Sequence, residues 1–156
     1  MGRLIVVTLL GLLAGCSRAP VHRGKDAADW TQALHDPDPK VRAQAARSLG
    51  ALGKNSEAAV PDLIDALKDA DEKVRADAAE ALWSIGPLAK DAVPALTAAL
   101  RDKAPAVRLN AAGALGEIGP DARSAVPALT KVLRDPDTTV RDAATKAMTK
   151  IQPKKK

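Results

Sequence analysis

Residues 69–86 read DADEKVRADAAEALWSIG, and the pattern of this stretch returns every 33 residues along the chain. Its Val-Arg pair has counterparts at Val41-Arg42, Val107-Arg108 and Val140-Arg141. Other columns keep the same step: the aspartates Asp36, Asp69, Asp102 and Asp135, the leucines Leu34, Leu67, Leu100 and Leu133, and the prolines Pro61, Pro94 and Pro127. A fixed period of this length is typical of stacked helical repeats. The sequence therefore predicts four units, at about residues 26–54, 55–87, 88–120 and 121–152.

Each unit is expected to form two helices. In the second unit, the sequence predicts a first helix over residues 58–68, a turn over 69–71 and a second helix over 72–85. One face of that second helix gathers a single apolar stripe, made of Val74, Ala78, Ala81, Leu82 and Ile85. The expected N-caps of the second helices are Asp38, Asp71 and Asp137, a column that Ala104 breaks, and the residues expected to end them in the αL conformation are Gly53, Gly86 and Gly119.

A two-helix unit cannot bury such a stripe alone and must stack on its neighbours. The predicted fold is therefore all-α: a right-handed α-solenoid of about four 33-residue helical hairpins. The composition agrees, because Ala, the strongest helix former, occurs 33 times in 156 residues, while Phe and Tyr are absent. Trp30 shares a column with Leu63, Leu96 and Leu129, which predicts a core position for it.

The motif Asp-x4-Val-Arg-x2-Ala-Ala-x-Ala-Leu-x2-Ile-Gly of residues 69–86 resembles the HEAT-like repeats of the phycobilisome-lyase type. The resemblance covers about residues 26–152 and implies an armadillo-like helical solenoid. It is specific for fold and says little of activity. The last unit departs from the motif, with Met148 in place of Leu115 and Gln152 in place of Gly119, as capping units do.

The recurring acidic and basic residues are interpreted as structural. A residue present in every unit is most simply explained by contacts between units, and the resemblance implies an inter-repeat ionic ladder. Its expected members are Asp36, Asp69, Asp102 and Asp135 with Arg42, Arg75, Arg108 and Arg141.

Binding is expected where the units differ, on the face of the second helices that points away from the buried stripe. In solenoids of this type the second helices line the concave surface. The positions on this face are Ala43, Arg47, Gly50, Ala76, Glu80, Trp83, Leu109, Gly113, Gly116, Asp142, Lys146 and Thr149. From these the candidate partner-binding residues are Trp83, Leu109, Arg47, Glu80 and Lys146. Two interpretations of Trp83 stay open: an exposed partner anchor, or a ring that folds over neighbouring Ala residues and covers the core.

No catalytic, cofactor or metal site is predicted. The chain has two His, one Cys and no Tyr, so it has few nucleophiles, general bases or soft metal ligands. Deoxyhypusine hydroxylase resembles this scaffold but binds iron through His-Glu pairs, and neither His22 nor His35 is followed by Glu. Bilin lyases share the repeat, but no reactive Cys selects that activity here. Nucleic acid is not an expected partner, because the charges predicted on the concave face have mixed sign.

The first residues resemble the leader of a bacterial lipoprotein. A basic start and a short apolar run precede Leu13-Ala14-Gly15-Cys16, which is similar to the lipobox. The resemblance implies a signal peptide over residues 1–15, lipidation of Cys16, a tether over 16–25 and a lipid-anchored protein exported to a bacterial membrane. Ser17 favours the outer membrane in a Gram-negative host. The alternatives are a secreted protein with an incidental Cys, or a cytosolic protein with an apolar first helix.

Together these patterns predict a membrane-anchored scaffold, not an enzyme, that binds an unidentified protein partner on its concave face. The alternatives are a bilin lyase-like or oxidoreductase-like relative of the same repeat family and a purely structural spacer. Residues 153–156 form a basic tail. A monomer is expected, because charged residues at both ends disfavour end-to-end stacking.

Overall fold

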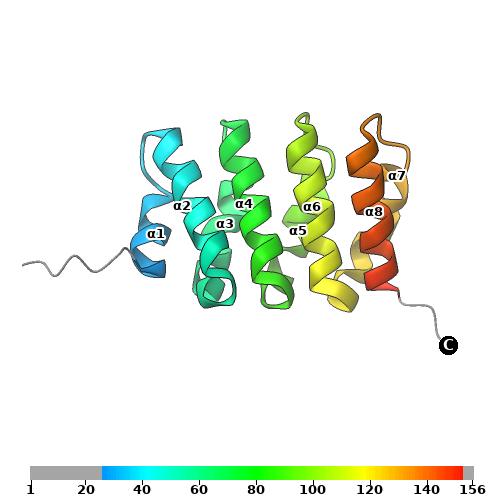
Figure 1. Ribbon diagram of the computed structural model, residues 1–156, viewed down its shortest axis with the longest axis horizontal. Helices are drawn as coiled ribbons and strands as arrows, with labels where there is room; N and C mark the ends of the chain where they lie inside the picture. The colour runs from blue at the N-terminus through cyan, green and yellow to red at the C-terminus, as the bar shows by residue number, and fades with distance from the viewer. Residues whose placement is uncertain (1–25, 153–156) are drawn as a thin grey trace, which may run out of the picture.

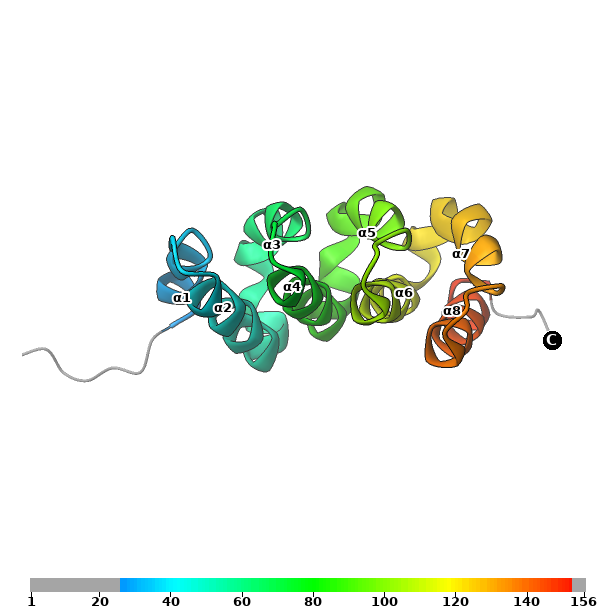
Figure 2. The same cartoon turned by 90° about the horizontal axis from the view of Figure 1, so that it is seen from above.

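The computed structural model describes residues 26–152, and all regular structure within that range is helical. The chain forms a short α-solenoid in which helices alternate between two rows (Figures 1 and 2). The second row is made of four 14-residue helices, α2 (Pro39–Leu52), α4 (Glu72–Ile85), α6 (Pro105–Ile118) and α8 (Thr138–Ile151). The first row is made of α1 (Ala27–Ala33), α3 (Val60–Ala66), α5 (Val93–Ala99) and α7 (Val126–Val132). Within residues 26–152, no helix is both long and apolar enough to cross a bilayer.

The second helices begin where the sequence predicts, because an aspartate caps three of them. Asp71 accepts hydrogen bonds from the Lys73 and Val74 amides at 2.8 and 3.2 Å. Asp38 and Asp137 cap α2 and α8 in the same way. Ala104 has the same extended backbone but no side chain that can accept, so α6 begins without a side-chain cap.

The first helices are shorter than the sequence predicts. In place of one helix over residues 58–68, a 3-10 segment η1 (Gly53–Ala59) leads into α3. The same arrangement returns as η2 (Gly86–Ala92) before α5 and η3 (Gly119–Ala125) before α7. Pro61 has no N–H, and its ring crowds the carbonyl four residues earlier, so a continuous α-helix cannot run through it. The tighter 3-10 turns carry the chain to the start of α3 instead.

The glycines that end the second helices do not adopt the αL conformation, contrary to the prediction. Gly86 has φ 69° and ψ −132°, and Gly53 and Gly119 lie in the same region. The positive φ is as expected, but the ψ values belong to the mirror image of the extended region, which side chains of L residues avoid. This backbone turns the chain sharply into the 3-10 segment instead of continuing a helical turn.

The buried stripe is confirmed. Its members in α4 are fully buried between the two rows and the neighbouring second helices. Small residues let the second helices approach closely: a Cβ placed on Gly50 would lie 3.1 Å from Cα of Ala81, and one on Gly116 would lie 2.9 Å from Cα of Ala147. Gly116 is buried by this close approach and Ala43 is buried as well, so, contrary to the prediction, neither presents open surface.

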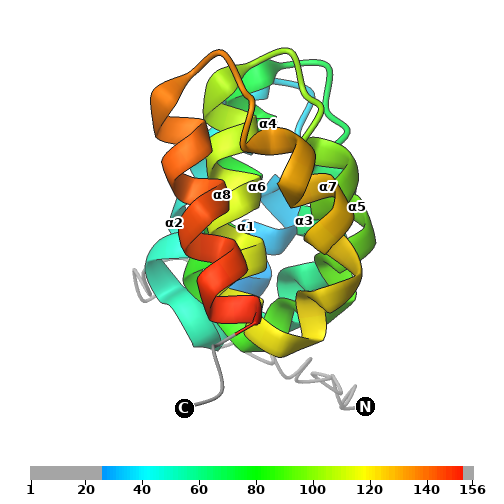
Figure 3. The same ribbon diagram turned by 90° about the vertical axis from the view of Figure 1, so that its right-hand side faces the viewer.

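Trp30 only partly fits its predicted core position. Its ring packs against the core but is half-buried, whereas the leucines of the same column are fully buried. The reason is its place in the array: among residues 26–152 no unit precedes α1, and α1 contains no fully buried residue. The view along the axis in Figure 3 shows the two rows end on, with α7 and α8 facing the viewer.

Candidate functional site

Three ion pairs join consecutive units at the turns between the two rows. Arg42 donates through Nε and Nη2 to the two carboxylate oxygens of Asp69, at 2.7 and 2.9 Å. The same bidentate pairing joins Arg75 to Asp102 and Arg108 to Asp135. In each pair the remaining guanidinium nitrogen donates to two backbone carbonyls of its own unit, as Arg75 does to Asp69 and Ala70. The pairs therefore connect turn, helix and next unit at once.

These contacts shift the carboxylates toward their charged form. The Arg42 guanidinium holds the pKa of Asp69 below its ordinary value, and Arg108 does the same to Asp135. At Asp102 burial is the largest influence and raises the pKa, but hydrogen bonds from Arg75 and the Ala104 amide outweigh it and the net shift is downward. In each rung both oxygens of the charged carboxylate accept hydrogen bonds from the arginine. This arrangement stabilises the stacking of units and leaves no carboxylate oxygen of the rung free to act as a general base.

The two end members of the ladder columns are not paired in this way. No unit precedes that of Asp36 within residues 26–152, and its carboxylate accepts a hydrogen bond from the Asp38 amide. No unit follows that of Arg141 within the described residues, and its guanidinium donates to the carbonyls of Asp135 and Pro136 and to the Thr138 hydroxyl. Within residues 26–152, neither side chain has an ion-pair partner.

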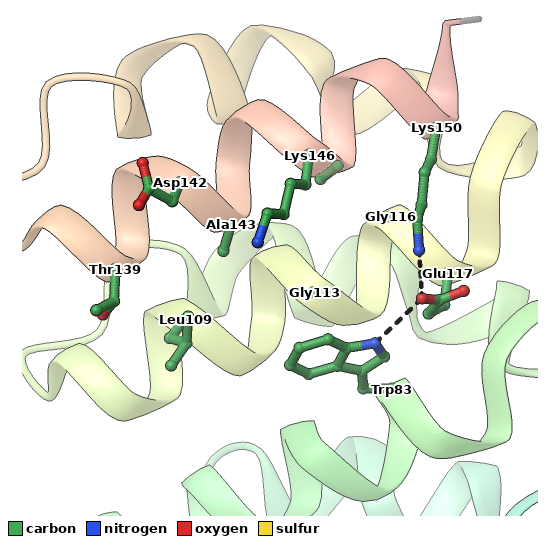
Figure 4. Close-up of a pocket in the computed structure, with 11 residues that line it drawn as sticks. Trp83, Leu109, Gly113, Gly116, Glu117, Thr139, Asp142, Ala143, Lys146 and Lys150 are labelled. Carbon is green, nitrogen blue, oxygen red and sulfur yellow. Dashed lines mark hydrogen bonds and ion pairs between the residues drawn. The ribbon is translucent and has the colours of Figure 1, made fainter.

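A groove crosses the second-helix face between α4, α6 and α8 (Figure 4). It has a volume of about 360 Å³, and most of its surface is apolar. Seen from above in Figure 2, the second helices lie on the inner side of a shallow arc, so the groove is on the concave face. The residues that line it are Trp83, Leu109, Gly113, Gly116, Glu117, Thr139, Asp142, Ala143, Lys146, Ala147 and Lys150.

Trp83 forms one wall of this groove by reaching across to the next unit. A Cβ placed on Gly113 would lie 2.6 Å from the indole ring, so the ring fits only because position 113 has no side chain. The indole Nε1 lies 3.5 Å from Oε1 of Glu117, which also pairs with Lys150 of α8. The side chain is still 37% exposed. Trp83 therefore combines features of both interpretations: it covers a neighbour, which is Gly113, and presents the rest of its ring to the groove.

The polar rim contains both charge signs. Lys150 hydrogen-bonds Glu117 and, with a smaller contribution from Trp83, lowers the pKa of the Glu117 carboxyl. Lys146 and Asp142 are exposed on the rim, and neither has a hydrogen bond or ion pair within the described range. The floor is therefore apolar, while one cation and one anion remain available at the edge.

Two of the predicted binding residues lie away from the groove. Arg47 is exposed on α2, where its Nε lies 3.6 Å from Oδ2 of Asp77. Glu80 is exposed on α4 but does not line the groove. The structure brings together Trp83, Leu109 and Lys146 and separates Arg47 and Glu80 from them. Leu13, Ala14, Gly15 and Cys16 lie outside the described residues.

Gly113 and Glu117 lie against Trp83, and sequence reasoning missed both contacts. A signal for Gly113 exists: its column holds Arg47, Glu80 and Lys146 in the other units, and the lone glycine follows the unit that carries the tryptophan. Recognising it requires knowing that position 83 faces position 113 across the junction. The 33-residue period does not specify which positions of adjacent second helices face each other.

The described residues show no arrangement suited to metal chemistry. In residues 26–152, no group of three or more His, Cys, Asp or Glu side chains is placed to hold an ion. What the face offers is an apolar groove with a charged rim, which is suited to recognition.

The family model for HEAT repeats matches residues 27–105 and residues 93–156. The chain belongs to the HEAT repeats. No curated protein matches this HEAT chain. The lyase-type subdivision expected from the motif is not distinguished by the match.

Solved structures similar to this HEAT chain include an engineered protein, with a TM-score of 0.71 and 25% identity over 81% of the chain and 62% of that protein. A designed armadillo repeat protein in complex with the peptide (KR)4 has a TM-score of 0.72 and 20% identity, over 81% of this chain and 64% of that protein. Human deoxyhypusine hydroxylase in complex with glycerol has a TM-score of 0.64 and 28% identity, over 83% of this chain and 44% of that protein. The chain spans less than two thirds of the length of each. Because engineered proteins and an enzyme share the fold, the HEAT arrangement alone does not define an activity.

Proposed function

We propose that this HEAT chain is a membrane-anchored scaffold that binds a protein partner in the groove between α4, α6 and α8. The observation that carries the proposal is the half-exposed Trp83, held over Gly113 beside an apolar floor. Tryptophan in a preformed pocket is a frequent energetic centre of protein interfaces. A designed armadillo repeat protein of similar fold was solved with a bound peptide, which supports this use of the surface.

The groove suits an apolar side chain of the partner flanked by polar groups. Leu109, Ala143 and Ala147 supply an apolar floor, and the rim presents Lys146 and Asp142 without partners in the described part of the chain. A rim of both signs orients a partner more than it attracts one at long range. This charge pattern favours a protein over a nucleic acid.

Membrane attachment is the second part of the proposal. It is supported by the similarity of Leu13-Ala14-Gly15-Cys16 to a lipobox. Two or more acyl chains anchor a protein firmly, whereas one anchors it marginally. The solenoid would then lie close to the bilayer, on a tether of about ten residues.

The test of partner binding is crosslinking in membranes of cells that express the full chain, followed by recovery of the crosslinked proteins. Trp83→Ala removes the groove wall, and Gly113→Ala keeps the tryptophan but displaces its ring. Lys90→Ala, an exposed position on η2, is the matched control. We expect one exported protein to be recovered with the wild type and the control and to be lost with both groove variants.

If the same proteins are recovered with all four chains, the groove is not the binding site and a spacer role becomes the better explanation. Attachment is tested separately, by membrane fractionation of a Cys16→Ser variant. We expect that variant to leave the membrane fraction, and its retention there would contradict lipid anchoring.

A further inference from the structure

The two ends of the solenoid are electrostatically complementary at the positions where units pair. Each internal rung joins an arginine to the aspartate of the next unit. One half of a rung is left at each end: the Asp36 carboxylate and the Arg141 guanidinium, neither of which has an ion-pair partner among residues 26–152. An added unit at either end would complete the rung.

A further contact between units occurs at the first junction, although its acidic column holds Ala95 and Ala128 in the third and fourth units. His35 of the first unit contacts Asp62 of the second, with Nε2 2.7 Å from Oδ1. At the ends, these columns hold Arg134 on the last unit and Asp29 on the first. Arg134 is exposed, and Asp29 uses one carboxylate oxygen to cap the Asp26 amide. The first end therefore presents two carboxylates where the last end presents two guanidinium groups.

The ends also expose apolar side chains that are buried at every internal junction. Leu133 is 36% exposed, whereas Leu100, one unit earlier, is 3% exposed against the following unit. Met148 is half-buried, whereas Leu49, Leu82 and Leu115 of its column are fully buried. At the first end Val41 is half-buried, whereas Val74, Val107 and Val140 are fully buried. At the last end these apolar side chains lie beside polar ones, because Thr145 and Thr149 are exposed on α8.

We propose that copies of this chain associate head to tail, with the α7 and α8 end of one copy docked on the α1 and α2 end of the next. The contact repeats the internal junction: Arg141 pairs with Asp36 of the second copy, and Arg134 lies near its Asp29. Leu133 is then covered as Leu100 is within the chain. The proposal reverses the monomer expected from the sequence, because the charges at the two ends differ in sign and are placed to pair.

This contact is heterologous and does not close on itself, so it produces short linear arrays. Thr145 and Thr149 stand where internal junctions use Ala and, twice, Gly, which makes the contact less tight than an internal one. A reversible, concentration-dependent association follows. The end faces do not include the groove of Trp83, and the inference stands independently of the proposed function.

The experiment is analytical ultracentrifugation of the full chain in detergent over a range of concentrations. The variants are Asp36→Arg, Arg141→Asp, the double reversal Asp36→Arg/Arg141→Asp and, as a control on η3, Asp121→Arg. We expect wild type and control to form species heavier than one copy, in proportions that rise with concentration. Each single reversal places like charges at the junction and is expected to weaken association about tenfold or more.

Thermal unfolding of each variant monitors whether it still folds. Two further results distinguish a lost contact at the junction from a general loss of folding. The double reversal is expected to regain association, because the pair is restored with its signs exchanged. An equimolar mixture of the two single variants is also expected to regain it, because Arg141 of one meets Asp36 of the other. The inference is overturned if the wild type stays a single copy up to millimolar concentration, or if both single reversals associate like the wild type.

Discussion

Ala104 occupies the N-cap position of α6, where the other second helices have a capping aspartate. Its φ and ψ of −84° and 122° match the −79° and 126° of Asp71, which caps α4. We expect Ala104→Asp to accept a hydrogen bond from the α6 backbone and to raise the free energy of unfolding by about 1 kcal/mol. Urea unfolding followed by circular dichroism measures it. Ala104→Asn is the uncharged control, and no gain in either variant would contradict the capping argument.

Asp77 is a buried carboxylate that is incompletely hydrogen-bonded. It is 5% exposed, and its Oδ2 has no hydrogen bond in the described structure. The same column of the next unit holds Asn110, whose Nδ2 donates to the Ala76 carbonyl at 3.0 Å. We expect Asp77→Asn to donate to α2 in the same way and to remove a desolvated carboxylate oxygen. Its ion pairs with Lys73 and Arg47 are long, at 3.3 and 3.6 Å.

The expected gain from Asp77→Asn is about 0.5–1 kcal/mol in the free energy of unfolding. Thermal unfolding at neutral pH measures it. Asp77→Ala is the control that removes the carboxylate without supplying a donor. A lower melting temperature for the asparagine variant would show that Arg47 and Lys73 make the buried carboxylate a net stabiliser.

Residues whose role depends on sequence neighbours were predicted well, and residues whose role depends on another unit were not. The caps and the buried stripe follow from spacing within one helix, and both are confirmed. The position of Trp83 over Gly113 depends on the offset between α4 and α6, which the period does not specify. The glycines were predicted in sign of φ but not in ψ, since ψ depends on the direction that the chain takes next.

The ladder joins each second helix to the turn of the next unit, and it makes the free energy of unfolding depend on pH. The pKa of Asp102 is lowered in the folded chain, so its contribution to stability is fully present above the ordinary Asp value of about 3.9 and is lost as pH falls through the lowered folded value. We expect Asp102→Asn to reduce the free energy of unfolding at pH 7 by about 2 kcal/mol. The variant should also lose less stability than the wild type between neutral pH and pH about 2.

Thermal unfolding across this pH range measures both effects. Asp121→Asn changes an exposed aspartate on η3 that belongs to no rung, and it is the matched control. Parallel pH curves for wild type and Asp102→Asn would show that the carboxylate of the rung is not what acid removes.

At this scale the sequence predicted the second helices better than the first. The bounds of α4 agree with the predicted 72–85, because an N-cap, a helical stripe and a terminal glycine all mark them. The first helices have fewer such signals, and their prolines divide each predicted helix into a 3-10 segment and a short α-helix. A proline also limits how far upstream an α-helix can extend, and the helix predicted over residues 58–68 does not take this limit into account.

For the whole molecule, position in the array decides how much a core residue contributes. Trp30 and Leu96 share a column, but Trp30 is half-buried on the terminal α1, whereas Leu96 is fully buried on α5. We expect Trp30→Ala to cost about 1–2 kcal/mol, below the range for a fully buried tryptophan, and Leu96→Ala to cost about 2–5 kcal/mol. Stability in such arrays is transmitted between neighbours, so the first loss should stay local.

Hydrogen exchange distinguishes the two variants. In Trp30→Ala, the amides of α1 should lose protection while those of α4 to α8 keep theirs. In Leu96→Ala, protection should fall on both sides of α5. A global loss of protection in the tryptophan variant would mean that the first unit supports the others more than its burial indicates.

The contact between Trp83 and Gly113 shows how a repeated chain can acquire one unique site. Position 83 shares its column with Gly50 and Gly116, and position 113 shares its column with three charged residues. Differences at two positions in adjacent units are therefore enough to place a tryptophan ring across one junction. Because the columns that form the stripe and the ladder are untouched by them, a lineage of such proteins can change what it recognises while its fold stays the same.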